Sequence, residues 1–194
     1  MKEISGILLA GGKSSRMGRD KAMLTFQGMS LLEWQVRKLQ TLGIEDIILS
    51  GHCPALDGTR AVADEYPNRG PLGGMHACMK QAGNPDCLIL SVDVPLVPAQ
   101  ALAGLAEAHR KSGAAVTLLQ HGEKWEPLIG VYKRGLFQPI ERILHGEHTA
   151  VRRLLEEVGF QVVTWPEDAL LFCNCNTPQD YEKLRRAAPC SIGQ

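Results

Sequence analysis

Short apolar runs alternate along the chain with segments in which apolar residues recur at helical spacing. The runs at residues 4–10, 46–50 and 87–93 are apolar on both faces, which is typical of strands buried inside a parallel sheet. A capping box at residues 30–33 (Ser-Leu-Leu-Glu) predicts the start of a helix, and Gly43 predicts its end. Further strands are predicted over 60–64, 114–119, 128–132 and 160–165, and further helices over 72–81, 98–111, 134–144, 149–158 and 178–186.

This alternation of strands and helices predicts an α/β fold, with a mostly parallel twisted sheet and helices on both faces. The length of 194 residues corresponds to one domain, and the chain contains no internal repeat and no linker. Residues 119–127 form the most polar interior stretch, for which we predict a mobile loop.

Composition excludes several classes of protein. Lys and Arg number 21 and are balanced by 21 Asp and Glu, so no basic field favours a long nucleic acid. The longest uncharged stretch, residues 94–106, is too short for a membrane span. Six cysteines scattered through a chain of this size indicate reduced thiols in a cytoplasmic protein. Cys173 and Cys175 fit two thiols alternating along a strand better than half of a metal site.

A loop rich in glycine and basic residues follows the first predicted strand. Residues 11–21 contain Lys13, Arg16, Arg19 and Lys21 together with three glycines. Glycines let a ligand approach backbone N–H groups, and fixed cations make charge-assisted bonds to phosphate oxygens. The spacing differs from both the G-x-x-x-x-G-K-[ST] loop and the G-x-G-x-x-G loop. The composition therefore suits a polyphosphate site and equally a solvated basic turn.

Two aspartates are expected at the carboxyl ends of predicted strands, at the edge where sheets of this kind bind ligands. Asp64 ends the strand over 60–64, and Asp93 ends the strand over 87–93. Each offers hard oxygen ligands to Mg²⁺, which usually takes one or two carboxylates plus substrate phosphates. Each is equally suited to capping its turn, so the residues alone leave both roles open.

A second glycine-rich turn, residues 70–74 (Gly-Pro-Leu-Gly-Gly), comes just before a predicted helix. It suits a close approach of the backbone to a flat base, and it also suits a simple helix start with proline near the first position. Asn174 and Asn176 alternate along a predicted extended segment and would share one face. Asn176 is equally suited to capping the last helix.

Four segments together resemble the molybdenum cofactor guanylyltransferases, the MobA family of the nucleotidyltransferase superfamily. Residues 9–21 (LAGGKSSRMGRDK) are similar to the family loop L-A-G-G-x-x-x-R-M-G-x-D-K, and residues 70–74 are similar to G-P-L-A-G. Residues 91–95 (SVDVP) are similar to the family's aspartate before a proline, and residues 174–178 (NCNTP) to its N-x-N-T-P. The resemblance covers the chain from Ile4 to Arg186.

The resemblance implies a single-domain Rossmann-like fold of the nucleotide-diphospho-sugar-transferase type over residues 1–194. Its nucleotide-binding half would span about residues 1–100 and its acceptor half about residues 101–188. The implied reaction transfers GMP from Mg·GTP to the terminal phosphate of molybdopterin and releases pyrophosphate, with Mn²⁺ as an alternative ion. GTP and molybdopterin would be its ligands, without nucleic acid or membrane. Transient contact with proteins that make or receive the molybdenum cofactor stays open.

The resemblance also assigns roles to single residues. Arg16, Lys21 and Asp93 would carry catalysis, with Lys21 on the phosphates and Asp93 as the metal ligand. The nucleotide and the acceptor would be held by Leu9, Ala10, Gly11, Gly12, Lys21, Ser50, Asp64, Gly70, Pro71, Leu72, Gly74, Asp93, Asn174 and Asn176. Ser50 stands where the family often has Asn, and Gly73 stands where Ala is usual.

Three other functions stay open from the sequence. A cytidylyltransferase acting on molybdopterin or on a sugar or polyol phosphate would share the fold, although such relatives tend to carry L-A-A-G where this chain has Gly11 and Gly12. A nucleotide-binding regulator that has lost catalysis is the second alternative. The presence of Arg16, Lys21 and Asp93 argues against it. A metal-binding protein that uses Cys173 and Cys175 is the third alternative.

Overall fold

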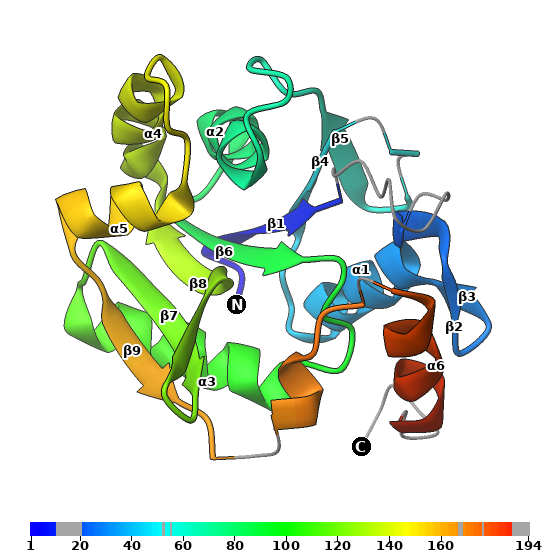
Figure 1. The fold of residues 1–194 in the computed structure, drawn as a ribbon. Coiled ribbons are helices and arrows are strands. Elements are labelled where there is room, and N and C mark those ends of the chain that lie inside the picture. The colour runs from blue at the N-terminus through cyan, green and yellow to red at the C-terminus, as the bar shows by residue number, and fades with distance from the viewer. Residues whose placement is uncertain (11–20, 52, 55, 167–168, 176, 188–194) are drawn as a thin grey trace.

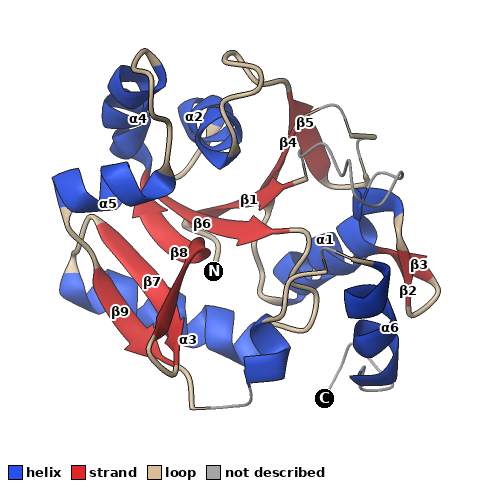
Figure 2. Cartoon of the chain, viewed as in Figure 1, coloured by secondary structure: helices blue, strands red, loops and turns tan. Residues whose placement is uncertain are grey.

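A seven-stranded sheet in the order β5-β4-β1-β6-β8-β7-β9 runs through the molecule, with helices on both sides (Figure 2). The computed structural model describes residues 1–10, 21–51, 53–54, 56–166, 169–175 and 177–187. The strands of this sheet are β1 (Ile4–Leu9), β4 (Asp46–Ser50), β5 (Thr59–Val62), β6 (Asp86–Ser91), β7 (Val116–His121), β8 (Lys124–Lys133) and β9 (Gln161–Thr164). The α/β fold predicted from the sequence is confirmed.

The sheet is parallel except at one strand. β1 pairs in parallel with β4 and β6, β4 with β5, and β7 with β9, whereas β8 runs antiparallel to both β6 and β7. The mobile loop predicted over residues 119–127 is wrong, because these residues are the paired ends of the β7–β8 hairpin. Gln120 pairs with Trp125 and His121 with Lys124, and Gly122 takes a left-handed φ of 55° in the turn.

The helices form two layers. Figure 1 shows α2 (Pro71–Gln81), α4 (Phe137–Leu144) and α5 (Val151–Val158) on one side of the sheet, and α1 (Leu31–Thr41) and α3 (Ala99–Ser112) on the other. Helix α6 (Pro178–Ala187) lies near a two-stranded hairpin that the sequence did not predict, formed by β2 (Thr25–Phe26) and β3 (Met29–Ser30). None of the described helices is long and apolar enough to cross a bilayer.

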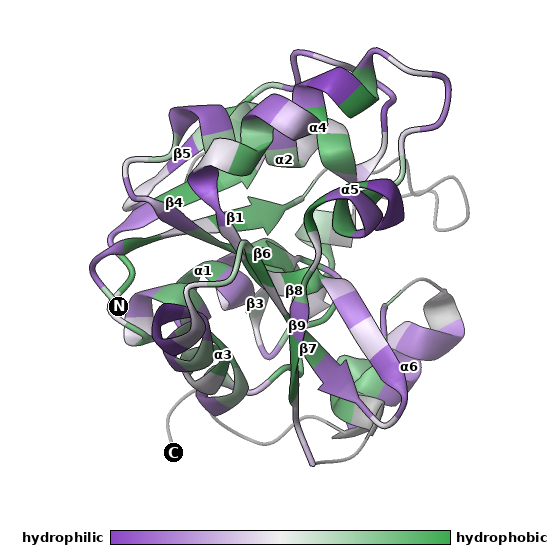
Figure 3. Cartoon of the chain, turned by 90° about the vertical axis from the view of Figure 1, so that its left-hand side faces the viewer, coloured by the Kyte–Doolittle hydropathy of each residue, from purple (hydrophilic) through white to green (hydrophobic). Residues whose placement is uncertain are grey.

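Each side of the sheet has its own apolar core. One cluster lies on the α1 and α3 side and includes Leu8, Leu39 and Leu90, and the other lies on the α2, α4 and α5 side and includes Ile7 and Ile89. Both faces of β1 and β6 are therefore buried, as the unbroken apolar runs predicted. Figure 3 shows these central strands as the hydrophobic interior between more hydrophilic helices.

Local sequence signals explain where α1 begins and ends. The Oγ of Ser30 accepts a hydrogen bond from the Glu33 N–H at 3.1 Å, as the capping box predicted. At the other end Gly43 has a φ of 73°, and its N–H donates to the Gln40 carbonyl, so a left-handed glycine stops the helix.

Near the candidate site, two predicted strand ends and one predicted strand differ from the structure. β5 ends at Val62 and β6 at Ser91, so Asp64 and Asp93 each stand two residues beyond a strand instead of closing it. The strand predicted through Cys173 and Cys175 is wrong: residues 173–175 are irregular. The predicted alternation survives there, because Cys173 is exposed and Cys175 is buried.

Candidate active site

The sheet register brings the carboxyl ends of four parallel strands to one edge. Leu9 at the end of β1 lies between Ser50 of β4 and Ser91 of β6, and Ser50 is in turn paired with Val62 of β5. From β1 the sheet continues to β4 and β5 on one side and to β6 on the other. Such a reversal of strand order opens a crevice beyond the strand ends, where α/β proteins bind their ligands.

Asp93 lies in the turn that follows β6, next to the end of β1. The Val92 N–H donates to the Leu9 carbonyl at 3.2 Å, which fastens the turn to the end of β1. The Ser91 hydroxyl donates to Oδ1 of Asp93 at 2.5 Å, and the Asp93 side chain is half-buried. The Cys175 N–H donates to the Asp93 carbonyl at 2.8 Å. The sequence expectation that Asp93 stands at this edge is therefore correct.

Three side chains of helix α1 donate hydrogen bonds to the turn that contains Asp93. They were not identified from the sequence. The amide nitrogen of Gln35 donates to the carbonyls of Ser91 and Val94 at 3.2 and 3.1 Å. Lys38 Nζ and Trp34 Nε1 donate to the Pro95 carbonyl at 2.7 and 3.0 Å. The only signal in the sequence is that polar Gln35 and Lys38 follow Leu31 at spacings of four and seven, on the buried side of the helix.

Lys38 is an unusual residue at this place because its ammonium group is buried. The side chain is 7% exposed, and burial alone lowers the pKa of Lys38 to about 7. Gln35 is fully buried. Gln35 and Lys38 are therefore two buried polar side chains in an otherwise apolar cluster that also contains Trp34, Val94 and Val97.

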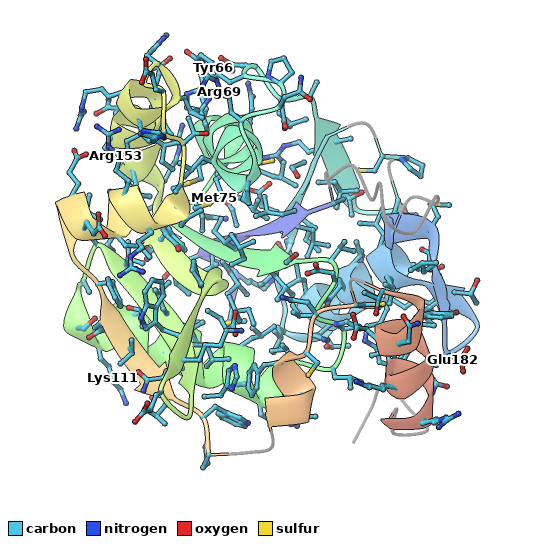
Figure 4. The ribbon with its side chains drawn as sticks, in the orientation of Figure 1. Tyr66, Arg69, Met75, Lys111, Arg153 and Glu182 are labelled. Atoms are coloured by element: carbon cyan, nitrogen blue, oxygen red, sulfur yellow. The ribbon has the colours of Figure 1, made fainter. Side chains whose placement is uncertain are left out.

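Asp64 follows β5 and lies against the first turn of α2. A Cβ built on Gly73 would lie 3.7 Å from Oδ2 of Asp64 and only 2.8 Å from the Tyr66 carbonyl oxygen. The turn after Asp64 is fastened to α4 and the residues that follow it: the Tyr66 hydroxyl donates to Glu141 of α4 at 3.2 Å, and Arg69 Nη1 donates to the Gly146 carbonyl at 3.2 Å. Figure 4 shows Tyr66 and Arg69 beside α2 on the side that faces α4.

The predicted base-binding turn, residues 70–74, has clear packing roles. Gly70 precedes α2 with a φ of 64°, and Pro71 is the first helical residue. Leu72 is fully buried in the core. A Cβ on Gly74 would come within 3.0 Å of Ser50, so the absence of a side chain lets α2 approach β4. Contact of this turn with a nucleotide stays a prediction.

The segment around Asn174 approaches the Asp93 turn from the C-terminal half of the chain. Asn174 is exposed, and with Leu96, Asp180 and Lys183 it lines a small cavity of about 90 Å³. The structure therefore brings Asn174 and Asp93 to neighbouring positions through the Cys175–Asp93 backbone bond. Asn176 lies outside the described residues.

The first basic loop also lies outside the described residues. Gly11, Gly12 and Arg16 fall in the range 11–20, and Ala10 is the half-buried residue that leads into it. Lys21 begins a short 3₁₀ turn, Lys21–Met23, whose backbone is described and whose lysine side chain is not. The roles of these residues stay predictions.

The cysteines show features of interior packing. Cys78 and Cys87 are buried thiols; burial raises the pKa of Cys87 to about 12 and that of Cys78 further still. Across the described ranges, no three His, Cys, Asp or Glu side chains gather closely enough to hold a metal ion by themselves.

The four parallel strands stand in the order β5-β4-β1-β6, and a carboxylate lies beyond the point where the strand order reverses, which is typical of α/β proteins that bind nucleotides. The particular family follows from comparison with known proteins. Residues 6–163 match the family model described as the MobA-like NTP transferase domain. The chain belongs to this family and is a nucleotidyltransferase.

Similar proteins cover almost the whole chain. The chain is 32% identical over 198 residues to a molybdenum cofactor guanylyltransferase of Syntrophotalea carbinolica, covering 97% of this chain and 94% of the relative. It is 33% identical over 180 residues to a molybdenum cofactor guanylyltransferase of Pseudomonas fluorescens, covering 90% of each. These identities show membership of the same family over one continuous domain.

Solved structures share the fold at lower identity. A Mycobacterium tuberculosis protein superposes with a TM-score of 0.80 at 20% identity, covering 96% of this chain and 98% of the other. The molybdopterin-guanine dinucleotide biosynthesis protein A of Archaeoglobus fulgidus superposes with a TM-score of 0.75 at 22% identity, covering 94% and 97%. Both therefore share the fold of this chain.

Proposed function

We propose that the chain transfers GMP from Mg·GTP to the terminal phosphate of molybdopterin, forming a guanine dinucleotide cofactor and pyrophosphate. Guanine and the pterin acceptor are supported by the relatives, which are named molybdenum cofactor guanylyltransferases and align over nine-tenths or more of the chain. The observation in this structure that carries the proposal is the common edge formed by Leu9, Ser50 and Ser91, because both the basic loop and Asp93 follow directly from it.

We assign the two substrates to two parts of this edge. The nucleotide would occupy the side formed by β1, β4 and β5, within residues 1–100. The pterin would approach from the side of Asn174, within residues 101–188. The exposure of Asn174 next to the Asp93 turn supports this division.

Asp93 fits a Mg²⁺ ion by the chemistry of its donor atoms. Its carboxylate is a hard oxygen ligand, it is half-buried at the ligand-binding edge, and the Ser91 hydroxyl fixes the orientation of one oxygen. Mg²⁺ typically takes one or two protein carboxylates and completes its shell with phosphates and water. A single strand-end aspartate is enough protein for such a site, and Mn²⁺ would satisfy the same donors.

The chemistry requires positioning and charge neutralisation more than proton transfer. An oxygen of the acceptor phosphate forms a bond to the α-phosphorus of GTP, and the bond to the bridging oxygen breaks, so its electron pair leaves with pyrophosphate. The attacking phosphate is already anionic, so no general base is needed. The bound ion would neutralise phosphate charge. Arg16 and Lys21 would add charge-assisted hydrogen bonds, and Asp93 would fix the ion.

A nucleotide panel tests the proposal. Pyrophosphate release is measured with GTP, CTP, ATP and UTP, each with and without molybdopterin and Mg²⁺. Of the four nucleotides, only GTP is expected to release pyrophosphate. This release should require both molybdopterin and the metal. Preference for CTP would indicate a cytidylyltransferase. Tight GTP binding without release of pyrophosphate would indicate a regulator.

Two further features accompany the proposal. We place the protein in the cytoplasm, which the buried thiols Cys78 and Cys87 support because they suit a reducing compartment. We expect its encounters with proteins that supply or receive the cofactor to be transient. A pull-down under crosslinking, with and without GTP, would measure that contact.

A further inference from the structure

We propose that Gln35 and Lys38, assisted by Trp34, are positioning residues that set the place of the Asp93 carboxylate. This inference rests on the proposed function, in which Asp93 binds the metal ion. None of the three side chains is assigned to touch substrate. They act on the backbone that carries Asp93.

The backbone on both sides of Asp93 is fixed by hydrogen bonds from two different elements. Side chains of α1 hold the carbonyls of Ser91, Val94 and Pro95. The Cys175 N–H holds the carbonyl of Asp93 itself. Four of the five carbonyls from residue 91 to residue 95 are therefore held by side chains of α1 or by the segment around Cys175.

Gln35 is the most specific part of this arrangement. Its one amide nitrogen donates to Ser91, two residues before Asp93, and to Val94, one residue after it. Both N–H groups of the amide are thereby used across the turn. Because Ser91 also donates its hydroxyl to Oδ1 of Asp93, Gln35 fixes the residue that orients the carboxylate.

Lys38 and Trp34 fix the far end of the turn together. Both donate to the Pro95 carbonyl, so the two lone pairs of that oxygen are occupied. The proline restricts the backbone of Val94 as well. The turn is thus anchored at its start by Gln35 and at its end by Lys38 and Trp34.

These polar groups are costly to bury, which argues against a purely structural role. Among the described residues the Gln35 Oε1 atom has no hydrogen-bond partner, although it is buried. Lys38 places an ammonium group in the interior, and its lowered pKa reflects that cost. Apolar side chains of the same length would avoid burying these polar groups, but they would take from the Ser91, Val94 and Pro95 carbonyls the donors that fix the turn. What the polar groups add is a defined geometry for the turn.

The test compares Gln35→Met and Lys38→Met with a matched control on the same helix. Gln40 also donates its amide to a backbone carbonyl, that of Asp57 at 3.2 Å, but this turn does not lead to Asp93. Gln40→Met therefore makes the same substitution on the same helix and removes an exposed amide-to-carbonyl bond that has no link to Asp93. The readout is the affinity for Mn²⁺ in the presence of a non-hydrolysable GTP analogue, measured by electron paramagnetic resonance, together with the thermal unfolding midpoint.

We expect Gln35→Met and Lys38→Met to weaken Mn²⁺ binding about 10-fold, the scale seen when partners that orient a metal ligand are removed. Both variants should remain folded at the assay temperature even where the lost hydrogen bonds lower the unfolding midpoint, and kcat should fall more than KM rises. Gln40→Met should keep wild-type Mn²⁺ affinity. If Gln35→Met does not fold, Trp34→Phe, which keeps the ring and loses the N–H, takes its place.

A double variant identifies Asp93 as the residue through which the effect acts. In the Asp93→Asn background, Gln35→Met should change Mn²⁺ affinity no further. An undiminished 10-fold effect there, or wild-type affinity in both single variants, overturns the positioning role. Failure of the proposed reaction looks different: the wild type would bind Mn²⁺ and nucleotide and release no pyrophosphate, while the Gln35 effect on Mn²⁺ remained.

Discussion

Asp93 and Asp64 both stand two residues beyond a parallel strand at the same edge of the sheet, but different parts of the molecule hold them. The Asp93 turn is held from the interior by α1 and by the segment around Cys175. The turn after Asp64 is held by Tyr66 and Arg69, whose partners belong to α4 and the residues after it. One carboxylate belongs to a turn that buried polar side chains of α1 anchor, and the other lies against the first turn of α2.

The hydrogen bonds around an aspartate beyond a strand are therefore as informative about its role as its position at the edge of the sheet. A metal ligand must be held in place before the ion arrives, and interior hydrogen bonds to its backbone provide that. A carboxylate beside the first turn of a helix is stabilised by the helix dipole. We therefore expect substitutions at the two turns to separate activity from stability.

The largest expected effect belongs to Asp93→Asn, which keeps the shape of the side chain and removes its charge. Pyrophosphate release should fall at least about 100-fold, the scale seen when one preorganised stabilising group is lost. The thermal midpoint should change little. GTP affinity in EDTA should be nearly that of the wild type, and the gain on adding Mg²⁺ should largely vanish. Normal Mg·GTP binding by a poorly folding variant would instead make Asp93 a turn cap, with Asp64 the next candidate.

A smaller effect, on stability, is expected for Gly74→Ala behind the Asp64 turn. The new Cβ would press on Ser50 at 3.0 Å, pushing α2 away from β4. We expect a loss of about 1–2 kcal/mol in the free energy of unfolding, measured by urea titration. Gly104→Ala in α3 is the control, since nothing lies within 4 Å of its Cβ; it should gain up to about 1 kcal/mol. Equal effects would contradict the close approach of α2 to the sheet.

Burial of Lys38 beneath the Asp93 turn should make the free energy of unfolding depend on pH. The pKa of Lys38 falls from its ordinary value of 10.5 to about 7 on folding, so above pH 7 the unfolded chain binds more protons than the folded chain. The free energy of unfolding of the wild type should therefore rise between pH 7 and 8.5, by about 1–2 kcal/mol relative to Lys38→Met.

The buried thiols of Cys78 and Cys87 set the upper limit of the pH range for that measurement. Cys87 and Cys78 have raised pKa values in the folded chain, so above about pH 9 they ionise first in the unfolded chain and lower stability. Urea unfolding of wild type and Lys38→Met at pH 7, 7.75 and 8.5 stays below that range. Parallel curves for the two proteins would mean that Lys38 titrates normally in the folded state.

The smallest expected effect belongs to Asp64→Asn. Removing a negative charge that lies against the first turn of α2 should cost about 0.3–1 kcal/mol of stability. The drop in kcat/KM for GTP should stay below about tenfold, and the Mn²⁺ affinity should fall far less than in Asp93→Asn. Loss of Mn²⁺ binding comparable to that of Asp93→Asn would make Asp64 a second metal ligand and remove the contrast between the two turns.

Periodicity and turn chemistry were sufficient to predict the main strands, the helices and the edge at which Asp93 lies. Runs such as residues 87–90 are buried on both faces, and Ser30 and Gly43 mark the ends of a helix through local bonds. The paired ends of β7 and β8 were missed because their polar residues, such as Gln120, His121 and Lys124, do not show the alternation of apolar and polar positions that predicts a strand. Gln35 and Lys38 were missed because their partners are backbone carbonyls some 56 residues or more away, which no local pattern encodes.

The central place of β1 has a consequence for synthesis of the chain. Leu9 is made early, but its partner Ser91 follows 82 residues later, the difference between the two paired positions. At 5–20 residues per second the ribosome needs roughly 4–16 s for that interval. During this interval the apolar strand β1 has one unpaired edge, with which other nascent chains can pair. We expect losses during rapid overexpression to arise at this stage, and slower translation or a bound chaperone to recover them.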